Sequence, residues 1–374
     1  PCRELILTGL ERLEYRGYDS AGFALFGQNG DGLVESVRAV GNLSRLREAA
    51  GDGGAAAATS GLGHTRWATH GRVTEENAHP HSSADGSVLV VMNGIIENYS
   101  ELRRELQEQG VRFTSETDTE VLPHLIAREY AGDLAAAVRA VLPVLGGHFG
   151  DVYKRQVLPM LGGHFAFVAA HVDEPGRLVA ARRECPLVIG VGDGERFVAS
   201  AIPAFLRETR DVVLIEDDEV VVVEAGRHAI WSGGVLLDER PPKRVDWDED
   251  AAEKGGYETF MLKEIHEQPT ALWDTIGDRL RPDGSVELPG LGLDEAALAR
   301  VERIHVVACG TSYHAGLVGR YLIEDWARVP VHVEVASEYR YRTCLAGPGD
   351  LVLGITQSGE TADTLAAMRV ARER

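Results

Sequence analysis

Residues 63–81, GHTRWATHGRVTEENAHPH, lie between short β-type runs, and the elements around them decide the fold class of the first part of the chain. AGFALF and SVLVVMNGI on either side are predicted strands, and further short strands follow between residues 165 and 237. NYSELRRELQEQG and TEVLPHLIAREY have the apolar spacing of helices. Helices mixed with many antiparallel-type strands predict an α+β domain, which we expect to cover residues 1–240.

The later part of the chain follows a different pattern. PPKRVDWDEDAAEKGG, residues 241–256, is rich in charge, Pro and Gly, and we expect it to be a linker. Over residues 257–374, the nearly continuous apolar strands RIHVVA, VPVHVEVA and LVLGIT are accompanied by helical patterns. This combination is typical of a doubly wound α/β domain with a parallel sheet.

Composition excludes several classes of function. The chain has 374 residues with 58 Asp+Glu against 38 Lys+Arg, a formal net charge of −20. Because the negative electrostatic field of such a chain repels phosphate backbones and anionic lipid, we expect neither nucleic acid nor a membrane as a partner. The four cysteines form no CxxC pair, and the sequence has no signal-peptide pattern or membrane-length apolar run. These features predict a cytoplasmic enzyme.

One segment is repeated. VLPVLGGHF begins at residue 141, and VLPMLGGHF begins at residue 157. A short repeat seen only twice matches no repeat architecture. We interpret residues 141–164 as a local duplication, and we expect the extra copy to loop out at the surface, where insertions are tolerated.

Two polar elements of the first domain have the residues of a ligand site. Arg66 in a strand can clamp a carboxylate through two hydrogen bonds, while the indole of Trp67 covers the ligand. Asn93 and Gly94 follow an apolar run. A side-chain amide next to a glycine N–H is the pair of donors that an oxyanion hole needs.

SETDTE, residues 115–120, supplies a third polar element. Asp118 can pair with an ammonium group. Thr117 and Glu120 fit a capping box that starts the following helix, which would place Asp118 in its first turn. Together with the carboxylate clamp and the amide, this element predicts an amino-acid site beside an oxyanion hole.

Several histidines lie in the same stretch, at His64, His70, His79 and His81. They could form a metal cluster or be structural side chains with satisfied hydrogen bonds. Their spacing matches no known zinc site, so we favour structural histidines and expect no metal.

Two strand-to-helix turns of the second domain predict a phosphate site. CGTS, residues 309–312, and TQSGET, residues 356–361, each follow an apolar strand and precede a helix. Free N–H groups, the positive end of the helix dipole and hydroxyl donors favour an anion there. Either turn alone can be a simple helix cap, but two at the carboxyl ends of parallel strands form a crevice. Neither has a nucleotide-binding glycine motif.

Together these motifs resemble those of a known family. The first part is similar to the glutaminase domain of glucosamine-6-phosphate synthases, or isomerising glutamine:fructose-6-phosphate aminotransferases, in YRGYDSAG (15–22), HTRWATHG (64–71), NAHPH (77–81), NGIIENY (93–99) and SETDTE (115–120). The second part resembles the start of the sugar-isomerase (SIS) region in EIHEQP (264–269), ACGTSYHAG (308–316), ASEYRYR (336–342) and TQSGETADTL (356–365). The likeness covers nearly the whole chain outside the repeat.

The resemblance implies a four-layer αββα N-terminal-nucleophile (Ntn) hydrolase fold, followed by a partial SIS domain. It implies a glutamine site made of Arg66, Trp67, Thr69, His70 and Asp118, with an oxyanion hole at Asn93 and Gly94. It also implies a fructose 6-phosphate site made of Thr311, Ser312, Thr356, Gln357, Ser358 and Thr361. The implied reaction releases ammonia from glutamine, adds it to fructose 6-phosphate and isomerises the product to glucosamine 6-phosphate. The family works as a homodimer without a metal or organic cofactor.

The chain departs from the family pattern at its ends. The family nucleophile is an opening Cys followed by Gly and a strand, whereas Cys2 follows a proline and precedes a helical pattern. Because a nucleophile must be placed accurately, we do not assign that role to Cys2. The second SIS half is also missing from this sequence, so we expect an inactive fragment. The alternatives are a non-catalytic sugar-phosphate-binding regulator and another glutamine amidotransferase of the same type.

Overall fold

The computed structural model describes residues 2–27, 32–51, 58–68, 71–143, 163–246, 256–257, 260–281, 283–288, 290–357, 359 and 361–374. Contacts divide the chain into two compact units, residues 1–260 and 261–374. Each unit is described by itself. The expected duplication at residues 141–164 falls mostly outside the described residues.

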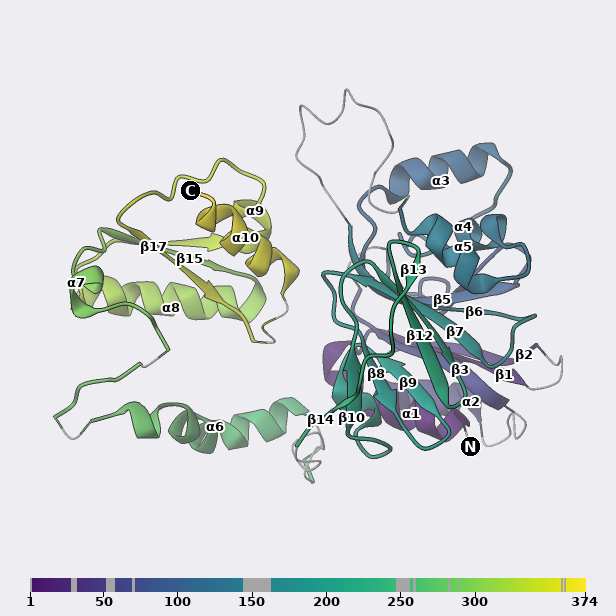
Figure 1. The fold of residues 1–374 in the computed structure, drawn as a ribbon. Coiled ribbons are helices and arrows are strands. Elements are labelled where there is room, and N and C mark those ends of the chain that lie inside the picture. The colour runs from purple at the N-terminus through teal and green to yellow at the C-terminus, as the bar shows by residue number, and fades with distance from the viewer. Residues whose placement is uncertain are drawn as a thin grey trace. The chain divides into compact units, whose positions relative to one another are not determined.

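The first unit is built on two antiparallel sheets that face each other (Figure 1). The smaller sheet has the order β2-β1-β3, from β1 (Ser20–Gly27), β2 (Leu33–Val40) and β3 (Ala58–Arg66). The larger sheet has the order β13-β12-β11-β7-β6-β5-β4 over the described residues. Its strands are β4 (His81–Ser82), β5 (Val88–Ile95), β6 (His164–His171), β7 (Arg177–Arg183), β11 (Glu219–Glu224), β12 (Arg227–Ser232) and β13 (Val235–Leu236).

Strand β1 shows how the layers arise. Phe23 packs in a core beneath two helices, α1 (Cys2–Leu13) and α2 (Leu43–Ala50), on the outer side of the smaller sheet. Phe26 instead packs in the core between the two sheets. Successive side chains of a strand point to opposite faces, so one fully buried strand contributes to two cores.

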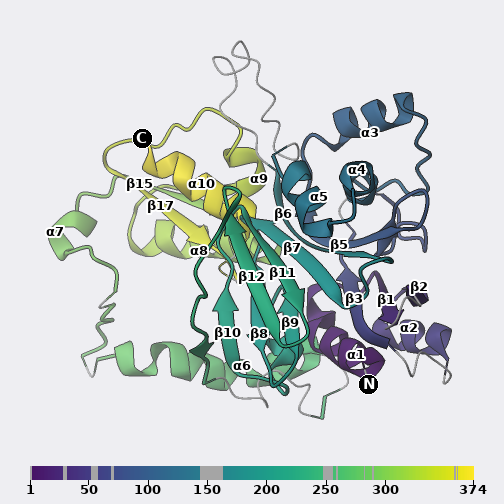
Figure 2. The same ribbon diagram turned by 45° about the vertical axis from the view of Figure 1, so that its right-hand side comes forward.

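Strand β5 repeats this arrangement in the larger sheet. Val91 packs between the sheets, whereas Val90 packs in a core shared with three helices. These are α3 (Tyr99–Glu108), α4 (Val121–Glu129) and α5 (Leu134–Val141). In both views they lie beyond β5 and β6, on the side away from β1 and β3 (Figures 1 and 2). The layer order is therefore helix, sheet, sheet, helix, which confirms the expected αββα fold.

A further antiparallel sheet, of order β14-β10-β8-β9, completes the first unit. Its elements are β8 (Val188–Val191), β9 (Arg196–Ala199), the short helix η4 (Ile202–Phe205), β10 (Asp211–Leu214) and β14 (Lys243–Arg244). Strand β14 pairs with β10 although it falls inside the expected linker. Charged residues are tolerated on an edge strand, so the linker-like composition did not exclude this pairing.

The second unit contains a parallel sheet of order β16-β15-β17 over the described residues. Its elements are α6 (Phe260–Ile276), η6 (Gly277–Arg279), α7 (Glu295–Leu298), β15 (Arg303–Ala308), α8 (Gly310–Trp326), β16 (Val331–Val335), α9 (Ala336–Tyr339), β17 (Asp350–Ile355) and α10 (Ala362–Arg372).

Helices cover both faces of this parallel sheet. Gly316 of α8 lies against Val306, and a Cβ there would be 2.9 Å from that side chain. On the other face, Val307 packs in a core with residues of α9 and α10. This arrangement confirms the expected doubly wound α/β class for the second unit.

The layered core gives a first prediction. Phe26 is 1% exposed between the sheets, whereas Leu33, its partner across β1 and β2, is 39% exposed. We expect Phe26→Ala to lower the free energy of unfolding by about 3–5 kcal/mol, because it leaves a cavity. We expect Leu33→Ala to cost less than about 1 kcal/mol. Urea unfolding followed by circular dichroism measures both, and equal losses would contradict the layer assignment.

Candidate functional site

The two facing sheets of the first unit are joined where β3 and β5 carry polar side chains. His64 of β3 and Asn93 of β5 are linked by a hydrogen bond, with 2.9 Å between His64 Nε2 and Asn93 Oδ1. Arg66 is the last residue of β3, and Gly94 follows Asn93 in β5. The predicted carboxylate clamp and the predicted oxyanion donors therefore belong to different sheets that meet at this point.

Gly94 is required by the backbone at this position. Its φ is +103°, in the region that favours glycine. A Cβ there would be 2.1 Å from the carbonyl oxygen of His164 on the neighbouring strand β6. No side chain fits between the two strands, so close pairing with β6 requires glycine directly after Asn93.

Arg66 and Asp118 place opposite charges beside this corner. Each is 4% exposed. Arg66 donates to the carbonyl oxygens of Arg72 at 3.2 Å and Gly71 at 3.5 Å. Asp118 Oδ2 accepts the N–H of Ile96 at 2.8 Å, which ties the carboxylate to the end of β5.

Burial is the main influence on the Arg66 guanidinium. It lowers the pKa of Arg66, while the charges of Asp19 and Asp118 act in the opposite direction. A buried cation and a buried anion near each other can hold the two charged ends of an amino acid.

The segment after Arg66 is anchored by a neighbouring loop. The N–H of Ala68 donates to Asp19 Oδ2 at 2.8 Å. Trp67 is 58% exposed, and its ring lies 5.4 Å from that of Tyr18. The predicted ligands Thr69 and His70 lie outside the described residues, so their roles and the covering role of Trp67 stay predictions.

Three of the histidines form a stack, in which His79 and His81 are buried and His64 is half-buried. The rings of His64 and His79 are parallel with centroids 4.1 Å apart, and His81 meets His79 edge-on at 4.7 Å. His79 Nδ1 accepts the N–H of Met92 at 3.2 Å, and His81 Nε2 lies 3.0 Å from Thr117 Oγ1. Over the described ranges, no three His, Cys, Asp or Glu side chains are placed to hold a metal ion.

Burial keeps these rings uncharged. It lowers the pKa of His64 to about 4 and that of His81 to about 3, and it lowers the pKa of His79 well below its ordinary value. At neutral pH each ring is therefore neutral and carries one N–H.

Glu120 has a role that the capping-box expectation missed. Its carboxylate accepts the N–H groups of Thr114 and Ser115, both at 2.7 Å, and the Ser115 hydroxyl at 2.6 Å. Helix α4 begins only at Val121 without a side-chain cap, so Asp118 precedes the helix instead of lying in its first turn. The expected capping box was wrong, because the carboxylate makes more hydrogen bonds with the preceding loop.

These bonds also hold the Glu120 carboxylate in its charged form. Burial would raise the pKa of Glu120, but the nearby His124 ring, whose Nε2 lies 3.7 Å from Glu120 Oε1, and the hydrogen bonds from Ser115 and Thr114 outweigh that effect and lower it to about 2. The loop that carries Asp118 is thus fixed by a buried, ionised side chain that accepts several hydrogen bonds.

Cys2 does not lie at this corner. It packs against the core beneath α1 and α2, and burial raises its thiol pKa. An activated thiol needs a lowered pKa, so this environment does not favour Cys2 as a nucleophile.

In the second unit, the two predicted phosphate turns lie at one edge of the sheet. Ala308 at the end of β15 pairs with Ile355 at the end of β17. Thr311 and Ser312 occupy the first turn of α8, directly after β15. Because parallel neighbours end at the same edge, this turn and the loop after β17 are adjacent.

The loop after β17 is shaped by its own hydroxyls. Thr356 Oγ1 lies 2.9 Å from Thr361 Oγ1 and accepts the N–H of Gly359 at 3.2 Å. Gln357 is exposed, and Ser358 lies outside the described residues. The sequence predicted that Thr356 and Thr361 belong to one phosphate-binding turn. In the structure, the contact between their hydroxyls holds the two ends of this turn together.

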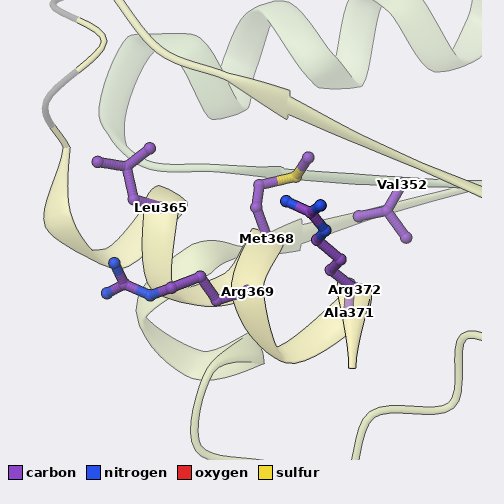
Figure 3. A pocket seen from close by; sticks show the side chains of 6 residues that line it. All are labelled: Val352, Leu365, Met368, Arg369, Ala371 and Arg372. Atoms are coloured by element: carbon purple, nitrogen blue, oxygen red, sulfur yellow. The ribbon is translucent and has the colours of Figure 1, made fainter. Parts of the chain in front are cut away.

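A separate groove of about 450 Å³ lies along the second unit (Figure 3). Its lining combines β17 with the later part of α10: Val352, Leu365, Met368, Arg369, Ala371 and Arg372. None of the predicted sugar-phosphate ligands lines it. The groove is therefore distinct from the edge that carries the phosphate turns.

Comparisons with known proteins agree with this division of the chain. The model of the "Glutamine amidotransferase domain" family matches residues 64–207, and that of the "SIS domain" family matches residues 297–374. A solved structure of the allosteric regulatory enzyme of purine biosynthesis has a TM-score of 0.53 at 18% identity, covering 96% of this chain and 89% of that one. That likeness concerns the fold alone. The chain thus combines a glutamine amidotransferase domain with a SIS domain.

Two relatives at 44–49% identity carry the same name. The glutamine–fructose-6-phosphate aminotransferase (isomerizing) of Mycolicibacterium paratuberculosis is 49% identical over 100% of this chain and 59% of its own length. That of Caldanaerobacter subterraneus is 44% identical over 99% of this chain and 58% of its own length. The resemblance seen in the motifs is confirmed, and the chain spans about 59% of the length of the first of these relatives.

The buried histidines give a prediction of pH dependence. An unfolded histidine has a pKa near 6.5, whereas burial lowers that of His81 to about 3. Between these values the unfolded chain binds more protons, so the free energy of unfolding falls as the pH falls below 6.5. We expect acidification from about pH 7.5 to about pH 5 to destabilise the wild type by about 2 kcal/mol more than His81→Gln.

Urea unfolding at the two pH values measures this difference. If the wild type and His81→Gln lose the same free energy of unfolding on acidification, the His81 ring is not held in its neutral form.

Proposed function

We propose that the first unit binds L-glutamine and that the second unit binds fructose 6-phosphate. In the complete reaction, the amide nitrogen of glutamine would be transferred to the sugar phosphate, giving glutamate and glucosamine 6-phosphate. The observation that carries this proposal is the pair of buried opposite charges, Arg66 and Asp118, beside Asn93 and Gly94. The names of the relatives support the two substrates.

In the first half-reaction, the amino-acid ends of glutamine are fixed by charge. Arg66 holds the α-carboxylate, with Thr69, His70 and Trp67 completing that end of the site. Asp118 holds the α-ammonium group. The side-chain amide then reaches the Asn93–Gly94 corner, where two N–H donors stabilise the negative charge that develops on its oxygen when a thiol attacks the carbon.

In the second half-reaction, the phosphate of the sugar binds at the strand ends of the SIS domain. The first turn of α8 offers backbone N–H groups together with Thr311 and Ser312. The loop after β17 adds Thr356, Gln357, Ser358 and Thr361. Helix N-termini and hydroxyls hold an anion without a metal, and we propose no metal or organic cofactor.

The homodimer implied by the family resemblance and the cytoplasmic location predicted from the sequence composition are part of the same proposal. Within the part of the chain that the structure describes, no helix combines the length and apolar character that crossing a membrane requires.

Glutamine binding tests the first half of the proposal. We expect Asp118→Asn to weaken L-glutamine binding at least about tenfold in isothermal titration calorimetry, because a neutral amide cannot replace the charge that faces the ammonium group. Asp173→Asn is a matched control, since the Asp173 side chain is 76% exposed. Equal affinities for Asp118→Asn and the control would contradict the site.

Sugar-phosphate binding tests the second half. We expect Thr356→Val to weaken fructose 6-phosphate binding about fivefold or more, because it removes a hydroxyl that shapes the loop and donates to the phosphate. Calorimetry with fructose 6-phosphate and with unphosphorylated fructose measures how much the phosphate contributes to the binding affinity. An unchanged preference for the phosphorylated sugar would remove Thr356 from the site.

A further inference from the structure

The side-chain amide of Asn93 can serve as an oxyanion donor in only one of its two orientations. Its Nδ2 must point at the ligand oxygen, because Oδ1 in that place would repel the developing negative charge. A free amide can turn over and exchange these two atoms. Something else in the site must therefore fix its orientation.

We propose that His64 is a positioning residue, whose Nε2–H donates to Asn93 Oδ1 and thereby aims Asn93 Nδ2 at the glutamine amide. The two atoms lie 2.9 Å apart. A carbonyl oxygen only accepts hydrogen bonds, so His64 Nε2 carries the proton in this arrangement. The inference rests on the proposed function, and it extends that function to a residue that does not touch glutamine.

The His64 ring is itself held in place by packing. It stacks on His79 with ring planes 14° apart. His79 accepts the N–H of Met92, the residue directly before Asn93. The His64 ring of β3 therefore packs on a side chain that is bonded to the β5 backbone directly beside Asn93. This limits the movement of the His64 ring relative to the Asn93 amide.

The same stack reaches the other end of the predicted glutamine site. His81, at the edge of His79, lies at hydrogen-bond distance from Thr117, the residue directly before Asp118. The residue that holds the ammonium group and the residue that supplies the oxyanion donor are thus both adjacent to contacts of one histidine stack. This placement fits a role in setting the spacing between the two ends of the ligand.

The protonation state of the stack supports the role. Burial lowers the pKa of His64, so the ring is neutral and has a single N–H to donate. If that proton were on Nδ1, His64 Nε2 would accept from Asn93 Nδ2 and turn Oδ1 toward the ligand. The tautomer of one ring therefore determines which atom of Asn93 faces the substrate.

His171 provides a matched comparison within the same domain. It is likewise stacked on another ring, with its ring centroid 3.7 Å from that of Tyr130 at 14°, and it is buried. Its Nδ1 accepts the N–H of Asp173. His171 lies opposite Val88 in the sheet, whereas Asn93 lies opposite Ala166, so the two sites are about 17 Å apart along the strands.

Two amino acids separate orientation of the amide from general binding. L-Norvaline has the same charged ends and three-carbon side chain as L-glutamine but no amide. In calorimetry, we expect His64→Phe to reduce the preference for glutamine over norvaline about tenfold, with norvaline affinity nearly unchanged. His64→Gln, which restores an N–H donor, should keep most of the preference, and His171→Phe should keep all of it.

Each other outcome has a defined meaning. A full preference in His64→Phe would overturn the positioning role. Loss of norvaline binding in His64→Phe but not in His171→Phe would overturn it as well, because the effect would then be on the fold of the site. If the wild-type chain binds neither amino acid, the proposed glutamine site is wrong. If the wild type binds glutamine and His64→Phe keeps the full preference, the site stands and only the positioning role is wrong.

A second measurement needs no variant to be functional. Nuclear magnetic resonance of the chain with ¹⁵N-labelled histidine reports the tautomer of each neutral ring, and the His64 signals are identified by their loss in His64→Gln. The proposal requires the Nε2–H tautomer of His64 at neutral pH. Finding the Nδ1–H tautomer, or a charged ring, would overturn it.

Discussion

The face-to-face packing of two sheets is the constraint on which the first unit depends. Strands β1 and β5 bury both of their faces, so each can carry functional groups only near its ends or where the sheets meet. Arg66 ends β3 in one sheet, and Asn93 lies in β5 of the other. The hydrogen bond between His64 and Asn93 closes this junction, and Arg66 and Asp118 beside it are buried, which strengthens their charged interactions.

Much of this arrangement can be predicted from the sequence. The apolar run RIHVVA predicts a buried parallel strand, and β15 covers the same residues. The motif residues Arg66 and Asp118 are buried beside Asn93, as a site for both charged ends of an amino acid requires. These features could be predicted from the sequence because each depends on residue types at short spacing, where the apolar pattern and the chemistry of the side chains indicate the same structure.

Other features depend on contacts that no local pattern records. Glu120 matches a capping box in its spacing, yet its carboxylate folds back onto the loop at Thr114 and Ser115. Lys243 and Arg244 have linker-like composition but pair with β10 because an edge was available. The role of His64 was hidden for the same reason. Its partner lies 29 residues away on another sheet, so the HTRW motif shows a histidine but not what it orients.

The most direct test of the central claim is a crystal structure of this chain with bound L-glutamine. The account predicts the α-carboxylate on the Arg66 guanidinium, the α-ammonium on Asp118, and the side-chain carbonyl oxygen within hydrogen-bond distance of Asn93 Nδ2 and the Gly94 N–H. Glutamine bound in the reverse direction, or bound away from this junction, would contradict it.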